Sequence, residues 1–415
     1  MEAEKWMKTM RVYDEYERRF AAARAEQTLR FPLDDETRES VRARTKAMLR
    51  WDDALVPRIH GMETVSTQDF PAFAVSQLRY RTWENVHACA SLYLPNAEGP
   101  LPLVFLFCGH GDAGRLTKGY VTMAQRLAKL GLAVLVPDNI GQGDRTFMGH
   151  RDVVSPFWCG LTLQGMIVME SVALIRYMRE DPRFDPARFG SCGNSGGGTL
   201  NVFLAALAPE LSALSASGYP SEFPYVLAKE RFHCACNLLP GSAHGPEMWE
   251  ILSLFAPKPL FLEQGQYDHL IPYDLAQRNA RKVGHIYRQL GAEENFGFET
   301  EPVPHSWTPG DRYRISRFLA GALGGAAPEE GDDEDPAVLE AIPGWHLTLP
   351  KWALTTDQAA ERLSGKRFPA GKALEDIFPP QFEGKRLCGD SIIPDIGRGP
   401  VMRVLAQMEC CLEKP

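Results

Sequence analysis

Residues 189–198 read Phe-Gly-Ser-Cys-Gly-Asn-Ser-Gly-Gly-Gly. The run opens as a short strand, passes through a Gly-x-Ser-x-Gly turn centred on Ser195, and enters a helix that begins near Thr199. Glycines flank the serine because the turn is tight and because other side chains would clash with the following helix. The pattern alone arises often by chance, but between a strand and a helix it predicts a nucleophile elbow. Ser195 is therefore the candidate nucleophile.

Short apolar runs on either side of this turn alternate with helical stretches. We expect strands at residues 103–107, 132–136, 189–192, 211–216, 259–262 and 296–303, and helices at 120–130, 163–178 and 312–323. Runs that are apolar throughout are typical of parallel strands buried on both faces. The order predicts the α/β class, with a doubly wound, mostly parallel sheet.

Two helices and a hairpin are expected ahead of this series. Apolar residues recur at helical spacing in residues 5–29 and 35–51, on a charged background. Residues 73–81 and 86–94 alternate between apolar and polar, and a short stretch joins them. This pattern favours an antiparallel hairpin.

The sequence also predicts where the main domain ends. We assign residues 1–325 to it, with an N-terminal helical segment at 1–52 and a cap insertion at 219–258. Residues 326–336 form a linker whose six acidic residues we expect to be solvated. Residues 337–415 contain apolar residues but no motif, and could be a docking arm, a small domain or part of a second unit.

Composition excludes several kinds of partner. The chain has 415 residues, with 45 Lys and Arg against 53 Asp and Glu, and a net charge of −8. Nucleic acids and anionic membranes are bound by clustered positive charge, so neither is an expected partner. A small, weakly charged substrate fits better.

Export and membrane signals are not evident in the sequence. The first residues are mixed in charge, and the longest apolar stretch, residues 165–175, is short and interrupted by Glu170. The nine cysteines are scattered rather than dense. We therefore expect a cytoplasmic protein with reduced cysteines.

Four features together resemble the α/β-hydrolase superfamily in its Ser, Asp, His chain order. They are the Ser195 turn, the turn at residues 109–112 after an earlier strand, residues 265–272 after a later strand, and His305. The finer pattern, residues 195–198, residues 256–260 and the paired N-terminal helices, is similar to the acetyl xylan esterase and dienelactone hydrolase-like branch. The resemblance covers roughly residues 35–325. It implies an α/β-hydrolase fold and a serine hydrolase that needs no cofactor or metal.

Asp268 and His305 are the candidate partners of Ser195. Asp268 lies in the loop that leaves the predicted strand 259–262, and His305 follows the next strand. A carboxylate at that place can hold the Nδ1 side of the histidine, so that the other nitrogen accepts the serine proton. Glu263 is the alternative acid, but it lies too close to the strand interior.

The resemblance also implies an oxyanion hole, made by two backbone N–H groups. One would come from Gly196 and one from the Gly111–Asp112 region, where we favour Asp112. His110 in the same turn is expected to orient that turn by hydrogen bonds, with direct substrate contact as the alternative.

Aromatic residues are candidates for the pocket walls. We select Trp158 and Trp307 as substrate-binding residues, with Phe157 as a further wall candidate. Aromatics of the cap insertion could roof the pocket or only pack the cap on the sheet: Tyr219, Phe223, Tyr225, Phe232 and Trp249.

Three other motifs have simpler explanations than a functional site. Residues 138–145 contain Gly-x-Gly but no third glycine, so we expect loop packing beneath the site rather than dinucleotide binding. Residues 232–236, with His244 nearby, could suggest a metal, but zinc sites usually place two to four residues between cysteines, and we expect a buried lid segment. Cys192 is expected to be a core thiol.

The resemblance predicts a carboxylic ester hydrolase that works through an acyl-enzyme, with a small acyl group such as acetate on a sugar or similar alcohol as substrate. A lactone hydrolase or serine peptidase on the same fold, and a non-catalytic binding protein, are the alternatives. Homo-oligomers are possible. The sequence does not determine the acyl group or the alcohol.

Overall fold

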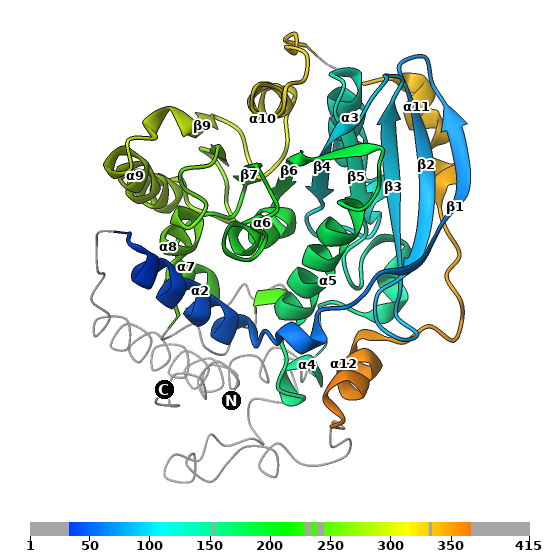
Figure 1. Ribbon diagram of the computed structural model, residues 1–415, viewed down its shortest axis with the longest axis horizontal. Coiled ribbons are helices and arrows are strands. Elements are labelled where there is room, and N and C mark those ends of the chain that lie inside the picture. Colours follow the sequence, from blue (N-terminus) through cyan, green and yellow to red (C-terminus); the bar gives the residue numbers. More distant parts are fainter. Residues whose placement is uncertain are drawn as a thin grey trace, which may run out of the picture.

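A nine-stranded sheet forms the centre of the computed structural model, which describes residues 33–151, 153, 155–228, 234–237, 239, 245–331 and 334–366 (Figure 1). The strand order is β1-β2-β3-β5-β4-β6-β7-β8-β9. The bounds are β1 His60–Asp69, β2 Phe73–Arg81, β3 His87–Pro95, β4 Leu101–Phe107, β5 Ala133–Pro137, β6 Phe184–Asn194, β7 Ala213–Ser217, β8 Leu260–Gly265 and β9 Phe296–Glu301.

The sheet is parallel from β5 to β9 and antiparallel from β1 to β3. β2 and β3 form the predicted hairpin, with Phe73 opposite Pro95 and Arg81 opposite His87. β3 then pairs with β5 in antiparallel fashion, which joins the hairpin to the parallel part. β1 was not predicted. It is an outer strand that is exposed along most of its length, so its sequence has no apolar alternation.

Alternate residues of the central strands face two separate cores. In β4, Leu103, Phe105 and Phe107 belong to one apolar cluster, and Val104 and Leu106 belong to the other. Burial of each such side chain contributes roughly 1.5–3 kcal/mol, so both faces stabilise the sheet. The continuous apolar runs of the sequence follow from this two-sided burial.

Helices cover both faces of the sheet, and the predicted doubly wound α/β architecture is confirmed (Figure 1). One core is closed by α3 (Lys118–Lys129) and α10 (Pro309–Leu323). The other is closed by α2 (Asp35–Leu49), α5 (Leu163–Met178), α6 (Gly196–Leu207), α8 (Met248–Ser253) and α9 (Tyr273–Gln289). Shorter elements are α4 (Ser155–Trp158), α7 (Phe223–Ala228), α11 (Pro336–Ala341), α12 (Thr356–Ser364), η1 (Asp53–Leu55), η2 (Gly114–Leu116), η3 (Gly143–Met148), η4 (Ala235–Asn237), η6 (Glu293–Asn295) and η7 (Ile342–Trp345).

A capping box fixes the start of α10, directly after the loop that carries His305. The Thr308 hydroxyl accepts from the Asp311 N–H at 3.2 Å, and the Asp311 carboxylate accepts from the Thr308 N–H at 2.8 Å. Such reciprocal bonds satisfy backbone donors that the first helical turn leaves open. They also anchor one end of the His305 loop to a helix.

The segment after the linker packs on the main domain. Val338 of α11 and Trp345 of η7 are buried in the same core as α3 and α10. Farther along, Thr356 at the start of α12 donates through its hydroxyl to the Gly149 carbonyl at 2.8 Å. Residues 337–366 are therefore part of the main domain rather than a separate docking arm. Residues 367–415 lie outside the described residues, as does the helix expected at 5–29.

The expectation of a fully solvated acidic linker needs correction. Glu334 pairs with Lys118 of α3 at 2.7 Å, and Asp335 lies 3.7 Å from Lys129 of the same helix. Asp335 also caps α11 by accepting from the Ala337 N–H. These exposed pairs contribute little energy, about 0–1 kcal/mol each, but they place the linker along α3.

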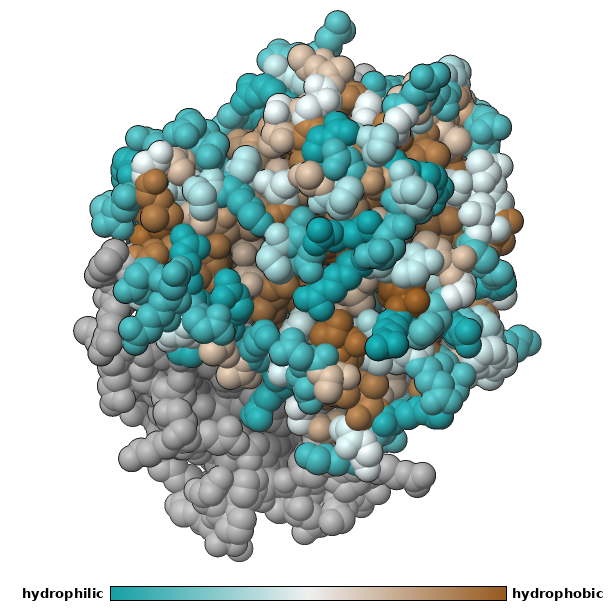
Figure 2. Space-filling model, viewed as in Figure 1, coloured by the Kyte–Doolittle hydropathy of each residue, from teal (hydrophilic) through white to brown (hydrophobic). Residues whose placement is uncertain are grey.

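Hydrophilic and apolar residues are interspersed on the face shown in Figure 2. Large apolar side chains with substantial exposure are spread over several elements: Val65, Phe147, Tyr177, Tyr267, Leu290 and Trp352. Among the described helices, none has the length and apolar character required to cross a membrane.

Candidate active site

Ser195 occupies the turn between β6 and α6 in a strained backbone conformation. Its φ is 57° and its ψ is −116°, outside the regions that residues other than glycine usually adopt. The Ser195 N–H donates to the Ser217 carbonyl of β7 at 3.0 Å, which holds the turn against the neighbouring strand. The strain raises the serine above the carboxyl end of the sheet, as a nucleophile elbow requires.

The glycines around Ser195 are required by close contacts. A Cβ on Gly197 would lie 1.9 Å from the Phe107 carbonyl oxygen, and one on Gly198 would lie 2.3 Å from the Ser217 carbonyl oxygen. Side chains at these positions would push α6 away from β4 and β7. Glycine is therefore required at these positions because α6 packs closely against β4 and β7.

Asp268 and His305 are brought together as predicted. Asp268 follows β8, His305 follows β9, and their Oδ2 and Nδ1 atoms lie 2.6 Å apart. A carboxylate only accepts hydrogen bonds, so Nδ1 carries the proton and donates it. The Nε2 atom then presents a lone pair.

The Asp268 carboxylate is buried and fully hydrogen-bonded. Its Oδ1 accepts from the backbone N–H groups of Leu270 at 2.8 Å and Ile271 at 3.0 Å, and its Oδ2 accepts from the Gln264 amide at 2.9 Å. Burial alone would raise the Asp268 pKa, but the hydrogen bonds from His305, Ile271 and Leu270 outweigh burial and lower it below its ordinary value. Asp268 therefore stays ionised at neutral pH.

Gln264 is a positioning residue that the sequence did not indicate. Its amide Nε2 also donates to the Ile271 carbonyl at 3.1 Å, so it joins the carboxylate to the loop that carries it. The alternative acid, Glu263, is buried inside β8, as expected from its place in the strand. Its carboxylate faces Arg314 at 3.9 Å rather than His305.

Ser195 and His305 line one pocket. His305 packs beside Gly218, where a Cβ would lie 3.0 Å from the ring, and its Nε2 has no hydrogen-bond partner among the described residues. The pocket is further lined by His110, Gly196, Thr199, Gly218, Tyr219, Tyr225, Val226, Asn237, Leu270 and Ile271. A strained serine, an imidazole whose Nε2 has no hydrogen-bond partner among the described residues and an apolar wall thus share one cavity.

The turn after β4 faces Ser195 through a different residue than expected. Asp112 is exposed and does not line the pocket. Gly109 comes closest, since a Cβ there would lie 2.9 Å from the Ser195 Cβ, but its N–H already donates to the Tyr120 hydroxyl at 2.6 Å. The next residue, His110, does line the pocket. Gly196 lies beside the His110 ring, where a Cβ would be 3.0 Å from it.

Trp307 does not lie where the prediction put it. It is 8% exposed, does not line the pocket, and packs edge-on against Tyr120. Its indole N–H donates to the Ser217 hydroxyl at 2.7 Å, which satisfies a polar group that burial would otherwise penalise. Trp307 therefore supports β7 and packs against Tyr120 of α3 from within the core. The side chains of Trp158 and Phe157 lie outside the described set.

The cap aromatics divide between the two roles considered. Tyr219 and Tyr225 line the pocket. Phe223 is fully buried and stacks on Phe203 of α6, and Trp249 of α8 is buried beneath the Lys282 ammonium of α9, so neither lines this pocket. Phe232 lies outside the described residues.

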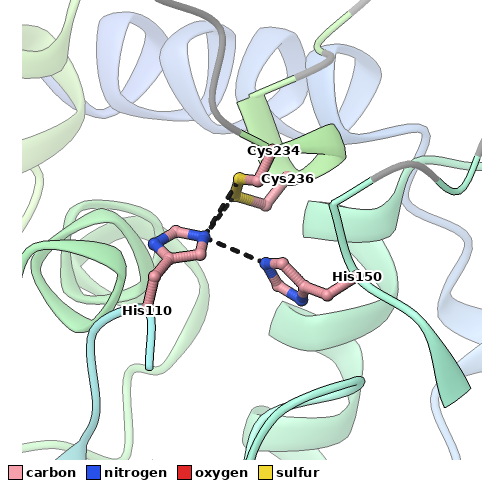
Figure 3. Close-up of side chains that lie close together, drawn as sticks. All are labelled: His110, His150, Cys234 and Cys236. Carbon is pink, nitrogen blue, oxygen red and sulfur yellow. Dashed lines mark hydrogen bonds between the residues drawn. A yellow bond between two sulfur atoms is a disulfide. The ribbon is translucent and has the colours of Figure 1, made fainter. Parts of the chain in front are cut away.

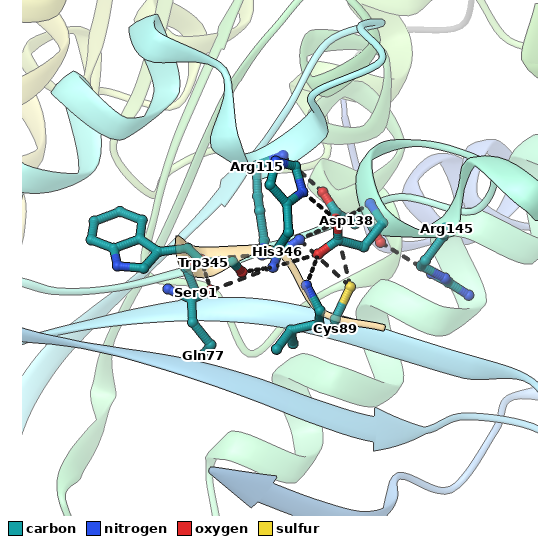
Figure 4. Close-up of polar contacts among 10 residues, drawn as sticks. Gln77, Cys89, Ser91, Arg115, Asp138, Arg145, Trp345 and His346 are labelled. Carbon is teal, nitrogen blue, oxygen red and sulfur yellow. Dashed lines mark hydrogen bonds and ion pairs between the residues drawn. The ribbon is translucent and has the colours of Figure 1, made fainter. Parts of the chain in front are cut away.

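A buried ion network joins the loops that follow β4 and β5 (Figure 4). The fully buried guanidinium of Arg115 contacts the Asp138 carboxylate and lies 2.8 Å from Asp144. Asp138 and Asp144, with Cys89, could hold a cation, but Arg115 already supplies the positive charge there. The network explains the Gly-x-Gly of residues 138–145, because a Cβ on Gly143 would lie 2.2 Å from the Asp138 carboxylate. That stretch packs as a loop around this network.

The cap carries a feature that corrects the expectation of reduced cysteines. Cys234 and Cys236 are joined by a disulfide, whereas Cys89, Cys108, Cys159 and Cys192 are buried free thiols (Figure 3). Cys192 lies in the core as predicted, and burial raises its pKa. Cys388, Cys410 and Cys411 lie outside the described residues, as do His233 and His244. His110 contacts the disulfide and His150, so it is held by side chains as well as lining the pocket.

Comparison with known proteins agrees with this geometry. Residues 60–231 match the acetyl xylan esterase family (AXE1). A hydrolase named YtaP from Bacillus subtilis (strain 168) is 26% identical over 251 residues, which make up 57% of this chain and 84% of that protein. The solved structure of the methylesterase BT1017 aligns with a TM-score of 0.66 at 19% identity, over 84% of this chain and 78% of that one. A glucuronoyl esterase from Solibacter usitatus aligns with a TM-score of 0.54 at 13% identity, over 69% of this chain and 92% of that one. At these identities the structural likeness establishes the fold.

Proposed function

The chain belongs to the α/β-hydrolase superfamily and matches the acetyl xylan esterase family at residues 60–231, and on this premise we propose that it hydrolyses carboxylic esters through an acyl-enzyme on Ser195. The observation that carries the proposal is the hydrogen bond of 2.6 Å between Asp268 and His305, in the pocket that also contains the strained Ser195. Ester hydrolysis is the activity class that the family match and the relatives support.

The proposed reaction uses only side chains and backbone groups of this chain. Nε2 of His305 takes the Ser195 proton as Oγ attacks the ester carbonyl, and the same nitrogen then gives that proton to the leaving alcohol. Asp268 remains ionised and stabilises the imidazolium that forms between these steps. Water attacks the acyl-enzyme in the same way and regenerates Ser195.

Two backbone N–H groups are proposed to stabilise the oxyanion. One is that of Gly196, at the start of α6, where the helix dipole adds partial positive charge. For the second we propose His110 in place of Asp112. His110 lines the pocket and Asp112 does not, and the Gly109 N–H is taken by Tyr120.

The residues that line the pocket support an uncharged ester as substrate. None of the described residues that line it is Lys, Arg, Asp or Glu, so a charged substrate would lose its hydration without gaining a partner. Val226, Leu270 and Ile271 supply apolar contact, and the hydroxyl groups of Tyr219 and Tyr225 supply polarity. An acetyl ester of a sugar or similar alcohol is the substrate class we propose.

Hydrolysis of p-nitrophenyl esters from acetate to octanoate tests the proposal directly. We expect turnover to fall with acyl length and to drop about 10⁶-fold in Ser195→Ala, as loss of such a nucleophile does. Ser66→Ala, an exposed serine on β1, is the matched control and should keep full activity.

The same assay separates the alternative functions. A lactone and a p-nitroanilide are added to the ester series. Faster hydrolysis of the lactone or the anilide than of every ester would move the assignment to a lactone hydrolase or a peptidase. Full ester turnover in Ser195→Ala would refute the acyl-enzyme.

A further inference from the structure

Four side chains with metal-binding atoms meet beside the pocket (Figure 3). His110 comes from the turn after β4, His150 follows η3, and Cys234 and Cys236 belong to the cap. Their ligand atoms all lie within 4.8 Å of one another. His150 and both cysteines are buried, and His110 is partly buried. Three segments that are distant in sequence therefore converge on one small volume with little access to water.

The orientation of His150 is that of a metal ligand. Its Nδ1 lies 2.7 Å from the Ile140 carbonyl oxygen, and because a carbonyl only accepts, Nδ1 must carry the proton. Its Nε2 therefore presents a lone pair, and it faces the His110 Nε2 at 3.0 Å. Ligating histidines are commonly fixed in this way, with one nitrogen bonded to the backbone and the other turned to the metal.

The spacing of the donor atoms is close to that of a tetrahedral site. The His110 Nε2 lies 3.0 Å from the Cys234 sulfur and 3.3 Å from the Cys236 sulfur. Zinc–nitrogen bonds of about 2.0–2.1 Å and zinc–sulfur bonds of about 2.3 Å separate the ligands by about 3.3–3.8 Å. The distances from the His110 nitrogen to the His150 nitrogen and to the two sulfurs thus need only small changes. The two sulfurs, which are bonded to each other, would have to move apart.

The single residue between the cysteines does not prevent a shared metal. Their Cα atoms are 5.4 Å apart, and each side chain can turn its sulfur toward the same point. Zinc sites usually place two to four residues between cysteines when the two cysteines come from one short motif. That rule does not apply when the remaining ligands come from distant segments. Here the two histidines come from other segments and complete the site.

We propose that the reduced form of this protein binds one Zn²⁺, or a divalent cation of the same class, through His110, His150, Cys234 and Cys236. Thiolate and imidazole are the donors that zinc prefers, whereas calcium and magnesium take oxygen ligands, and this group of four has no carboxylate. Four protein ligands fill a tetrahedron and leave no position for water or substrate. The metal itself therefore has a structural role and does not contact the substrate.

The disulfide and the metal are alternative states of the same two sulfurs. Reduction by a phosphine or thiol reductant adds two electrons and two protons to the Cys234–Cys236 bond and yields two thiols. Binding of the metal then releases those two protons, since the ligands are thiolates. A two-electron oxidant such as a small-molecule disulfide or a peroxide would take two electrons from the thiolates, re-form the Cys234–Cys236 bond and expel the ion.

The metal would fasten the cap to the turn beside Ser195. His110 and Asn237 both line the pocket, and Asn237 follows Cys236 directly and accepts from the Tyr219 hydroxyl at 3.1 Å. A bound ion would thus fix two parts of the pocket wall at once. This inference goes beyond the proposed esterase activity, and its test does not depend on that activity.

Metal content of the full chain is the primary test. The protein is reduced with a phosphine, incubated with Zn²⁺, freed of excess metal and measured by mass spectrometry of elements, with free thiols titrated in parallel. We expect one zinc per chain after reduction and none in the oxidised protein. Cobalt in place of zinc should give the thiolate charge-transfer band and the strong visible bands of a tetrahedral site. Absence of stoichiometric metal after reduction, or a disulfide that resists reduction of the folded protein, would overturn the proposal.

Variants locate the site. His150→Ala and the double variant Cys234→Ser/Cys236→Ser should each lose the zinc and the cobalt thiolate band. Cys159→Ser, a buried thiol outside the cluster, is the matched control and should retain one zinc. Circular dichroism shows whether each variant is folded, and the wild-type measurement stands if one is not. Zinc retained by both cluster variants would place the metal elsewhere and refute the assignment.

Discussion

The carbonyl oxygen of Trp345 accepts a hydrogen bond of 2.9 Å from the Arg115 guanidinium, across 230 residues of sequence. Next to it, His346 Nδ1 and the Leu347 N–H each lie 2.7 Å from the Asp144 carboxylate (Figure 4). Burial alone would raise the Asp144 pKa, but Arg115 and these two contacts outweigh burial and lower it. The segment after the acidic linker thus completes the buried network around Arg115.

Trp345→Ala should destabilise the whole protein. The Trp345 ring packs edge-on against Phe70 and Tyr93 and donates to Gln68, so its removal leaves a cavity in the core closed by α3 and α10. We expect a loss of about 3–5 kcal/mol in the free energy of unfolding, measured by urea titration. Trp352→Ala is the control, because that tryptophan is 60% exposed and should cost little. Equal losses in the two variants would contradict the packing.

Arg145 and Glu170 form a buried ion pair, and we expect either charge to destabilise the fold when the other is removed. The Arg145 guanidinium donates two hydrogen bonds of 2.7 and 2.9 Å to the Glu170 carboxylate, and both side chains are buried. Arg145→Met leaves the Glu170 carboxylate buried without its partner and should cost about 3–5 kcal/mol of unfolding free energy. The double variant Arg145→Met/Glu170→Leu should recover much of this loss. A double variant that is less stable than Arg145→Met would show that the pair itself stabilises the fold.

Local patterns were sufficient to predict much of this fold. The strand–turn–helix context around Ser195 and the apolar run of α5, whose bounds 163–178 were predicted as they are observed, depend on neighbours in sequence. The order of Asp268 and His305 after successive strands brings them to the same edge of a parallel sheet, so their meeting also followed from the sequence.

Long-range contacts decided what the sequence did not reveal. Trp307 follows the His305 loop and has the residue type of a pocket wall, but its N–H requires the Ser217 hydroxyl, which lies 90 residues away. The approach of Gly109 to Ser195, from which we propose His110 rather than Asp112 as oxyanion donor, depends on how the turn after β4 folds. The link between Arg115 and Trp345 gave no local signal at all.

Gly197→Ala should abolish the elbow geometry. The added methyl group would lie 1.9 Å from the Phe107 carbonyl oxygen, which is backbone and cannot rotate away. We expect loss of ester hydrolysis and a destabilisation in the range of about 1–3 kcal/mol for an overpacked core. Gly119→Ala is the matched control, since nothing lies within 4 Å of a Cβ at that position in α3, and alanine there should stabilise the helix slightly. Normal turnover by Gly197→Ala would mean that α6 does not approach β4 so closely.

Asp268→Asn should separate catalysis from folding. The amide can still accept from the Leu270 and Ile271 N–H groups, but it no longer fixes the protonated Nδ1 of His305, so we expect kcat for ester hydrolysis to fall about 10⁴-fold.

The pH dependence of stability gives a second readout. The Asp268 pKa is lower in the folded protein than in the unfolded chain, so its contribution to stability is present above the unfolded value and is lost as the pH falls through the folded one. The unfolding free energy of Asp268→Asn should therefore decline less steeply in acid than that of the wild type, as measured by calorimetry at a series of pH values. Parallel acid profiles would show that Asp268 is not held ionised by His305 and its backbone donors, and a kcat close to that of the wild type would remove it from the triad.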